Sequence, residues 1–184
     1  DRDTSGVLVF AKNEKIQKIM QDGWNNYVKT RGYIGIVEGI PSPAEGTITS
    51  WLKENPKSMK MVSSRSPEIS RQTDPRTGKA NDEWQKAITN YRTIATDIRI
   101  KGADSSPIRY SAVEFLLETG RKNQIRVHAA DELGCPIAGD RKYGAKTNPA
   151  GRLALHAGTL AFIHPVSGKV MTFTAKTPRE FGLR

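Results

Sequence analysis

Tyr33-Ile-Gly-Ile-Val37 is a short apolar run that we interpret as a β-strand, and the elements expected on either side of it decide the fold class. Gly39, Pro41 and Pro43 follow the run. Proline has no backbone N–H to offer to a neighbouring strand, so the strand should end before these residues.

A helix is expected immediately before this strand. Asn13 can cap its first turn. Apolar residues then recur at spacings of three and four, which predicts a stripe that faces a core: Ile16, Ile19, Met20, Trp24 and Tyr27. Further upstream, Gly6–Ala11 is a continuous apolar run that suits a strand buried on both faces. A strand, a helix and a strand in succession predict a mixed sheet with a helix on at least one face.

The later part of the chain also favours strands. Alternation within Ile94–Ile100 and Val113–Leu117 predicts two half-buried antiparallel neighbours. Two closing strands are expected at Leu155–Ile163 and Lys169–Thr174. Residues 53–86 are basic and poor in large apolar side chains, so we expect a long excursion or loop there. The whole chain, 1–184, is interpreted as one α+β domain.

One more helix is expected late in the chain. Asn123 is a candidate cap for it, and Ile125, Ala129 and Leu133 recur at intervals of four residues. Gly134 would end the helix.

The charge balance indicates a polyanionic partner or a solubilising surface, and charge alone does not separate the two. The chain has 184 residues and a formal net charge of +10. Residues 1–52 carry as many acidic as basic side chains, so the surplus lies beyond Leu52. The longest apolar stretch is far shorter than a membrane helix requires, and we expect a cytoplasmic protein. Cys135 is the only cysteine and the histidines lack a helical ligand spacing, so no structural metal is expected.

Two polar segments offer candidate chemistry. Asp1-Arg-Asp-Thr-Ser-Gly6 reads as an ordinary polar turn, or as a turn that presents a nucleophilic or basic carboxylate when a cation holds it ionised. Arg126, at the edge of the predicted helix stripe, is either that cation or a solvated arginine. A glycoside hydrolase that uses Asp1 and Asp3 is a weaker interpretation, because sugar-binding aromatic residues are missing around them and the basic charge does not suit a neutral glycan.

Five segments, taken in order, resemble the RluA family of pseudouridine synthases, and the similarity runs from Asp1 to about Thr174. They are Asp1-Arg-Asp-Thr-Ser-Gly6, Gly32-Tyr-Ile-Gly-Ile-Val-Glu-Gly39, Gly120-Arg-Lys-Asn-Gln-Ile-Arg-Val-His-Ala129, Gly134-Cys-Pro-Ile-Ala-Gly-Asp-Arg-Lys-Tyr-Gly144, and Arg152-Leu-Ala-Leu-His-Ala157 with Phe162-Ile-His-Pro165. The resemblance implies an RNA uridine isomerase without cofactor or metal. It also implies a mixed, largely antiparallel sheet with flanking helices and a central catalytic cleft.

The resemblance assigns roles to individual residues. Asp1 matches the family's aspartate, which attacks the ribose or removes a ribose proton while the N-glycosidic bond breaks. Tyr33 matches the tyrosine that packs against the uracil and assists loss of its carbon-5 proton, and Arg126 matches the arginine that pairs with the aspartate. Ile125 would form part of the apolar wall of the uridine pocket, and Thr4 is also assigned to substrate binding. A bidentate contact between Asp1 and Arg126 beside the Tyr33 ring would assemble the site from three distant segments.

The expected partner is RNA, with ribosomal RNA favoured over transfer RNA, and the chain is expected to be a monomer. Phosphate attraction is assigned to Arg121, Lys122, Arg141 and Lys142. The alternative is a non-catalytic RNA-binding or ribosome-assembly protein on the same fold.

Members of this family usually carry His-Arg-Leu immediately before the aspartate, and many carry an RNA-binding domain of the S4 type further upstream. Neither is present here. We therefore expect the chain to be the catalytic part of a longer enzyme.

Overall fold

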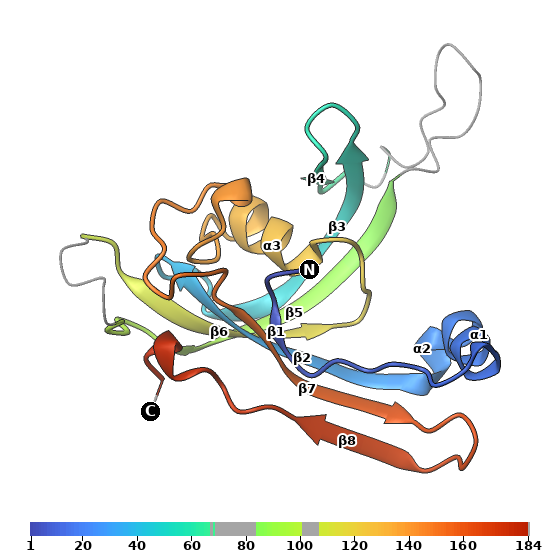
Figure 1. Cartoon of the computed structure of the whole chain (residues 1–184). Helices are drawn as coiled ribbons and strands as arrows, with labels where there is room; N and C mark the ends of the chain where they lie inside the picture. The colour runs from blue at the N-terminus through green and yellow to red at the C-terminus, as the bar shows by residue number, and fades with distance from the viewer. Residues whose placement is uncertain (67, 69–83, 101–106, 184) are drawn as a thin grey trace.

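The computed structural model describes residues 1–66, 68, 84–100 and 107–183, and these form a single eight-stranded sheet (Figure 1). The strands are β1 (Ser5–Gly6), β2 (Val28–Glu38), β3 (Glu45–Asn55), β4 (Lys60–Ser64), β5 (Gln85–Ala95), β6 (Tyr110–Leu117), β7 (Leu155–Ile163) and β8 (Val170–Thr174). Their order is β1-β7-β2-β6-β5-β3-β4, with β8 also paired to β7. Only β1 and β7 run parallel among the described strand pairs, so the predicted mixed, largely antiparallel α+β fold is confirmed.

The helices are short and few. They are α1 (Glu14–Asp22), α2 (Trp24–Tyr27) and α3 (Gln124–Val127), followed by a π-helical turn at His128–Glu132 and 3-10 turns at Arg141–Tyr143 and Arg179–Phe181. In Figure 1, α3 lies over one face of the sheet, whereas α1 and α2 lie beside the start of β2 and the end of β7. Within the described ranges, no helix has the length and apolar character needed to cross a bilayer.

The core lies between α3 and the sheet. On this side, Phe115 contributes from β6, Leu155 from β7, Ile125 from α3, and Ile137 from the loop beyond the π-helical turn. All four side chains are buried. Burial of Ile125 anchors the segment that carries Arg126, so the core also holds this residue in position.

The strand predicted at Gly6–Ala11 is wrong beyond Gly6. β1 ends at Gly6, and Leu8 and Phe10 are 75% and 80% exposed. The reason is competition for one edge of β7. β1 pairs with the start of β7, at His156 and Ala157, and β8 takes the same edge from Thr159 onward. The residues after Val7 therefore have no strand to pair with.

The helix predicted after Asn13 is confirmed, although its apolar stripe does not enter the core. The Asn13 side chain accepts a hydrogen bond from the Ile16 N–H at 3.0 Å, as a cap does. No residue of α1 is buried. Gly23 separates α1 from α2, and the apolar side chains of both helices line an open groove with Phe10. The amphipathic pattern therefore marks a groove rather than a core.

Part of the predicted 53–86 excursion is ordered structure. β3 and β4 form a hairpin in which Leu52 and Met61 pack with Ala87 and Val127. The hairpin escaped prediction because few of its inward-facing side chains are large and apolar. Residues 67 and 69–83 of the excursion lie outside the described residues.

The strand predicted at Ile94–Ile100 is displaced. β5 ends at Ala95, and Asp97 adopts a left-handed backbone with φ of 54°. Ile98 and Ile100 pack in the core beyond the end of this strand, whereas Ile94 is 43% exposed, so the alternating residues do not form the buried face of one strand. The true strand, Gln85–Ala95, buries small or polar residues such as Ala87 and Thr89 and therefore gives little hydrophobic signal. It pairs with β6 in antiparallel fashion, as predicted for the neighbours.

The predicted helix at Asn123 differs from the structure in two ways. Asn123 is left-handed, with φ of 52°, and its side chain caps nothing. The helix changes to π geometry at His128, although Gly134, with φ of 64°, follows its end as expected. Both closing strands, β7 and β8, are confirmed at the predicted places.

Candidate active site

A hollow of about 360 Å³ on the α3 side of the sheet brings together segments that are distant in sequence. Asp1 comes from the turn before β1, Tyr33 from β2 and Ile125 from α3. The complete lining is Asp1, Trp24, Arg31, Tyr33, Leu117, Gly120, Arg121, Lys122, Asn123, Gln124, Ile125 and Leu155. Three residues assigned to the site by sequence therefore meet around one space.

Arg126 is held by two carboxylates. Its Nη1 donates to Asp1 Oδ1 at 3.1 Å. Its Nε and Nη2 donate to the two carboxylate oxygens of Asp140, both at 2.7 Å. Arg126 therefore pairs with Asp1, as the resemblance implies, but through one hydrogen bond, and its bidentate partner is Asp140. The geometry leaves a single guanidinium nitrogen for Asp1.

The electrostatics of this cluster keep Arg126 charged. Its side chain is 14% exposed, and that of Asp140 is 1% exposed. Burial lowers the pKa of Arg126, but the hydrogen bonds and charge of Asp140 outweigh this effect and raise the pKa overall. A fixed positive charge beside Asp1 favours the ionised carboxylate.

Local backbone geometry places Asp1. Gly6 has φ of +116°, and a Cβ at this position would lie 2.1 Å from the Ala157 carbonyl oxygen. Only glycine lets the chain approach β7 this closely. Thr4 Oγ1 donates to Asp1 Oδ2 at 3.4 Å, and the Asn123 side chain donates to Oδ1. Thr4 does not line the hollow, so its contact is with Asp1 rather than with the space itself.

The left-handed turn at Asn123 has a consequence for the site. It aims the Asn123 amide at the Asp1 carboxylate, while its own Oδ1 accepts from the Tyr143 hydroxyl at 3.2 Å. The Arg126 guanidinium lies over the Tyr143 ring, 5.1 Å from its centroid. Tyr143 thus supports both partners of Asp1.

Tyr33 presents a neutral phenol. Burial raises its pKa, and the nearby charge of Arg31 offsets this only in part. The phenol is therefore protonated at neutral pH and can act as a packing surface or as a proton-bearing group. Ile125 and Leu155 add apolar surface to the same hollow.

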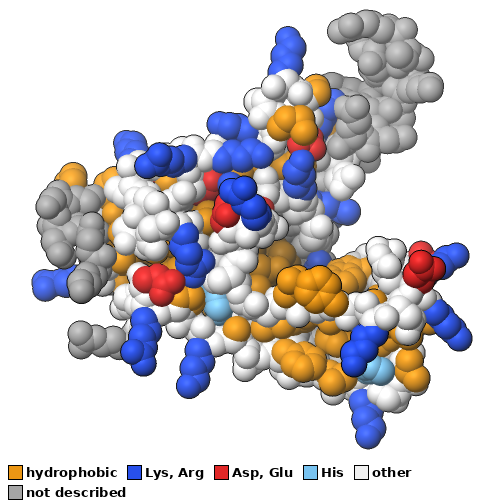
Figure 2. Space-filling model, viewed as in Figure 1, with side chains coloured by type: hydrophobic (Ala, Val, Ile, Leu, Met, Phe, Trp, Pro, Cys, Tyr) orange, Lys and Arg blue, Asp and Glu red, His pale blue; other side chains and the backbone are white. Residues whose placement is uncertain are grey.

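The four predicted phosphate-binding residues separate into two groups. Arg121 and Lys122 line the hollow. Arg141 and Lys142 lie on the 3-10 turn after Asp140, where Lys142 Nζ donates to the Met59 carbonyl at 2.7 Å. Lys122 is partly neutralised, since its Nζ contacts Glu54 Oε1 at 2.5 Å. Figure 2 shows Lys and Arg side chains gathered over α3 and the β3–β4 hairpin, with exposed hydrophobic side chains towards α1 and the β7–β8 hairpin.

Across the described part of the chain, no group of three His, Cys, Asp or Glu side chains is arranged to hold a metal ion.

Comparison with known proteins connects this geometry to a family. Residues 1–131 match the family model described as RNA pseudouridylate synthase. The chain belongs to the RluA-type family of RNA pseudouridine synthases. An uncharacterized RNA pseudouridine synthase of Bacillus subtilis, YjbO, is 34% identical over 181 residues, which cover 98% of this chain and 54% of that protein. Ribosomal large subunit pseudouridine synthase D of Zymomonas mobilis is 33% identical over 195 residues, which cover 100% of this chain and 52% of that protein.

The fold comparison agrees with the assignment to the pseudouridine synthase family. The solved structure of human RNA pseudouridylate synthase domain containing 4 superposes with a TM-score of 0.71 at 25% identity, covering 98% of this chain and 70% of that one. The chain spans about half the length of the curated relatives described above.

Several residues of this candidate site cannot be found by sequence reasoning. Asp140 lies within a quoted family segment, but nothing in its local pattern indicates the contact with Arg126. The helical spacing predicts Trp24 in a core-facing stripe, but Trp24 lines the hollow together with Arg31. Alternation along β2 places Arg31 two residues before Tyr33, and this spacing was the available signal for a shared face.

Proposed function

We propose that the chain catalyses the isomerisation of uridine to pseudouridine in structured RNA, with Asp1 as the reacting carboxylate. The observation that carries the proposal is the meeting of Asp1, Tyr33 and Ile125 around one hollow, with Arg126 in contact with Asp1. Membership in the pseudouridine synthase family supports the reaction type.

The reaction requires the target base to leave its stack and enter the hollow, as for other enzymes that act on a nucleobase. The Tyr33 ring offers a packing surface for the uracil, and Ile125 and Leu155 provide apolar walls. The open mouth of the hollow gives the ribose access to Asp1, whose side chain is 15% exposed.

Asp1 then attacks the ribose at carbon 1′ or removes a ribose proton, and the bond between carbon 1′ and N1 of the uracil breaks. The freed uracil turns within the pocket, and its carbon 5 bonds to carbon 1′ as the bond between Asp1 and carbon 1′ breaks or, in the second route, as Asp1 returns the ribose proton. Carbon 5 loses its proton and N1 takes one up, so product and substrate have the same composition. Tyr33 lies where it can assist the loss of the carbon-5 proton.

Arg126 and Asn123 have a positioning and electrostatic role in this scheme. Both donate to Asp1 Oδ1. Their hydrogen bonds favour the ionised carboxylate and hold it in one orientation, which a nucleophile or a base requires. Oδ2 receives only the longer contact from Thr4, and it is therefore the oxygen better placed to react.

Ribosomal RNA is the RNA class that we favour. One relative carries the name ribosomal large subunit pseudouridine synthase D. The formal charge of +10 and the Lys and Arg side chains beside the hollow suit a phosphate backbone. Transfer RNA is the second outcome that the experiment below distinguishes.

The test uses RNA labelled with tritium at carbon 5 of uracil, presented separately as large-subunit ribosomal RNA and as transfer RNA. We expect tritium release from ribosomal RNA by the unaltered chain, and none by Asp1→Asn. Asp3→Asn is the matched control, because Asp3 is exposed and pairs with Arg2, and it should retain release. A covalent adduct with 5-fluorouridine-containing RNA should also depend on Asp1. If neither the ribosomal RNA nor the transfer RNA released tritium, the proposal would be refuted and a protein that binds RNA without reacting would be favoured.

A further inference from the structure

A second hollow of about 340 Å³ adjoins the candidate active site. It is lined by Trp24, Asn25, Val28, Arg31, Glu118, Thr119, Gly120 and Arg121. Four of these residues, Trp24, Arg31, Gly120 and Arg121, also line the hollow that contains Asp1. The two spaces are therefore contiguous. A nucleotide chain with its target base in the first hollow would bring a neighbouring nucleotide to the second.

Arg31 and Arg121 place two positive charges at this boundary. Arg31 Nη2 donates to the Glu118 carbonyl at 2.6 Å, and Arg121 Nε donates to the Lys86 carbonyl at 3.0 Å. In the part of the chain that the structure describes, neither guanidinium forms an ion pair with a carboxylate. Burial lowers the pKa of Arg31; Tyr33 opposes this shift, and the charge of Arg121 adds to it. An anion bound here would relieve the repulsion between the two guanidinium groups.

Gly120 makes room for this arrangement. A Cβ at position 120 would lie 2.5 Å from Arg31 Nη1. The absence of a side chain at Gly120 therefore lets the guanidinium rest against the backbone of the loop that also carries Arg121. Because the conflicting atom is the end of a flexible side chain, Gly120→Ala should move the Arg31 guanidinium without disturbing the fold.

Trp24 supplies an aromatic surface beside the charges. It is partly exposed at the start of α2, and it also borders the apolar groove formed with Phe10 and Met20. Aromatic side chains in a positively charged groove form stacking platforms for unpaired bases, which every base can use because each has a π-face. The Trp24 indole therefore lines both the second hollow and the apolar groove beside α1.

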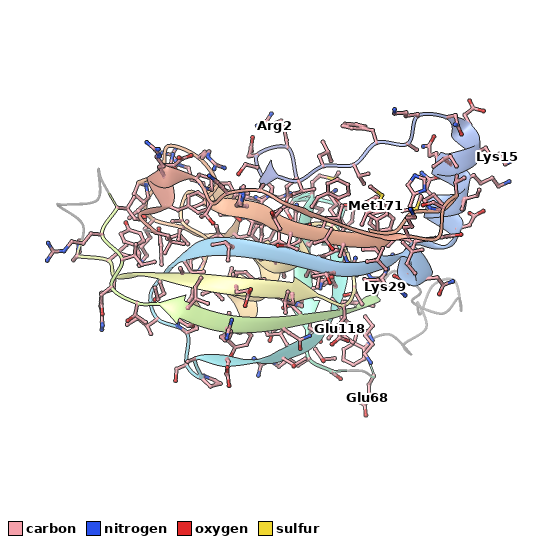
Figure 3. The ribbon with its side chains drawn as sticks, turned by 90° about the horizontal axis from the view of Figure 1, so that it is seen from below. Arg2, Lys15, Lys29, Glu68, Glu118 and Met171 are labelled. Carbon is pink, nitrogen blue, oxygen red and sulfur yellow. The ribbon has the colours of Figure 1, made fainter. Side chains whose placement is uncertain are left out.

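Glu118 is the acidic residue in the lining of this second hollow. Its Oε1 accepts from Asn90 Nδ2 at 2.9 Å, which draws the carboxylate towards β5. Figure 3 shows Glu118 just beyond the end of β6, on the side of the sheet where β2 begins near Lys29. The second hollow is therefore lined by two arginines and by one carboxylate that already accepts a hydrogen bond, so the net charge of its lining is positive.

We propose that Trp24, Arg31 and Arg121 form a subsite for the nucleotide adjacent to the target uridine, with its base stacked on Trp24 and its phosphate between the two arginines. This subsite rests on the proposed function, because it is defined by its position next to the reacting nucleotide. It extends RNA recognition beyond the uridine itself to residues on β2 and α2.

The test measures steady-state tritium release from large-subunit ribosomal RNA labelled at carbon 5 of uracil. For Trp24→Ala and Arg31→Ala, we expect KM to rise by about tenfold, with kcat within about twofold, since stacking or a phosphate contact contributes to binding rather than to chemistry. Trp24→Phe should restore most of the lost affinity. Gly120→Ala should act like Arg31→Ala, and Arg31→Ala should reduce the salt dependence of binding by about one phosphate contact. Lys15→Ala on exposed α1 removes the same charge elsewhere and should leave KM unchanged.

The outcomes separate the two proposals. Tritium release by the unaltered chain, with KM unchanged in Trp24→Ala, Arg31→Ala and Gly120→Ala, overturns the subsite and leaves the proposed function standing. A fall in kcat without a rise in KM overturns it too, because the residues would then act on the chemistry. Absence of release by the unaltered chain overturns the proposed function and the subsite with it. Circular dichroism of each variant shows whether the fold is retained, and Gly120→Ala and Trp24→Phe test the subsite even if an alanine variant fails to fold.

Discussion

His128 should make the stability of the chain depend on pH between about 6.5 and 4. Its imidazole is fully buried, and it accepts or donates hydrogen bonds with Ser50 Oγ at 2.9 Å and Thr89 Oγ1 at 2.8 Å. Burial lowers the pKa of His128 to about 4, and the charge of Glu132 opposes this shift only in part. The histidine therefore ties the segment after Arg126 to β3 and β5 while it is neutral.

The sign of the effect follows from proton binding. An unfolded histidine has a pKa of about 6.5, so between pH 6.5 and 4 the unfolded chain binds a proton that the folded chain excludes. Stability should be complete above pH 6.5 and should fall as the pH decreases towards 4. A difference of about 2.5 pKa units corresponds to about 3 kcal/mol, of which about 2 kcal/mol is lost by pH 5.

The assay is urea unfolding at a series of pH values from 7.5 to 4. The unaltered chain should lose stability over this range by the amount above, in addition to any loss from carboxylates. His128→Asn should be less stable at pH 7.5 but should show a pH dependence that is flatter by about 3 kcal/mol. His164→Asn, in the turn after β7, is the control and should keep the slope of the unaltered chain. Equal slopes for the unaltered chain and for His128→Asn would refute the reasoning.

Two further variants test how the site is held. Asp140→Asn removes the charged bidentate partner of Arg126, and it should lower the free energy of unfolding by about 3 kcal/mol and tritium release by at least about a hundredfold. Glu180→Gln breaks the more exposed pair with Arg152 and should lower the free energy of unfolding by less than about 1 kcal/mol. Equal losses in both variants would contradict the role of Asp140. Gly6→Ala should abolish release by forcing β1 away from Ala157, and Gly168→Ala, which has a positive φ but open space around it, should lose only a little stability and keep activity.

The sequence predicted the sheet best where hydrophobic alternation and burial agree. β2, β6 and β7 each carry branched or aromatic residues on the buried face, and all three were located. β5 was misplaced because Ala87 and Thr89 occupy its buried positions. The strand predicted at Gly6–Ala11 is too long. Its apolar pattern cannot reveal that β8 already pairs with the edge of β7 that a longer strand would need.

The candidate site was predicted from motif resemblance more than from local pattern. Asp1, Tyr33 and Ile125 do line one hollow, and Arg126 does contact Asp1. The strongest contact of Arg126, with Asp140, was missed because it joins two residues across a change in helix geometry and a loop. Such contacts depend on tertiary packing, which residue spacing does not encode.

The division of the Arg126 guanidinium between two acids has a consequence for turnover. Since Asp140 occupies Nε and Nη2, the buried guanidinium would keep a carboxylate partner even if the proposed reaction weakened the single contact of Asp1 with Nη1. Asp140 is thus a counterion whose contact with Arg126 does not depend on Asp1. In the proposed reaction, changes in the charge or position of Asp1 would therefore carry little electrostatic penalty at Arg126.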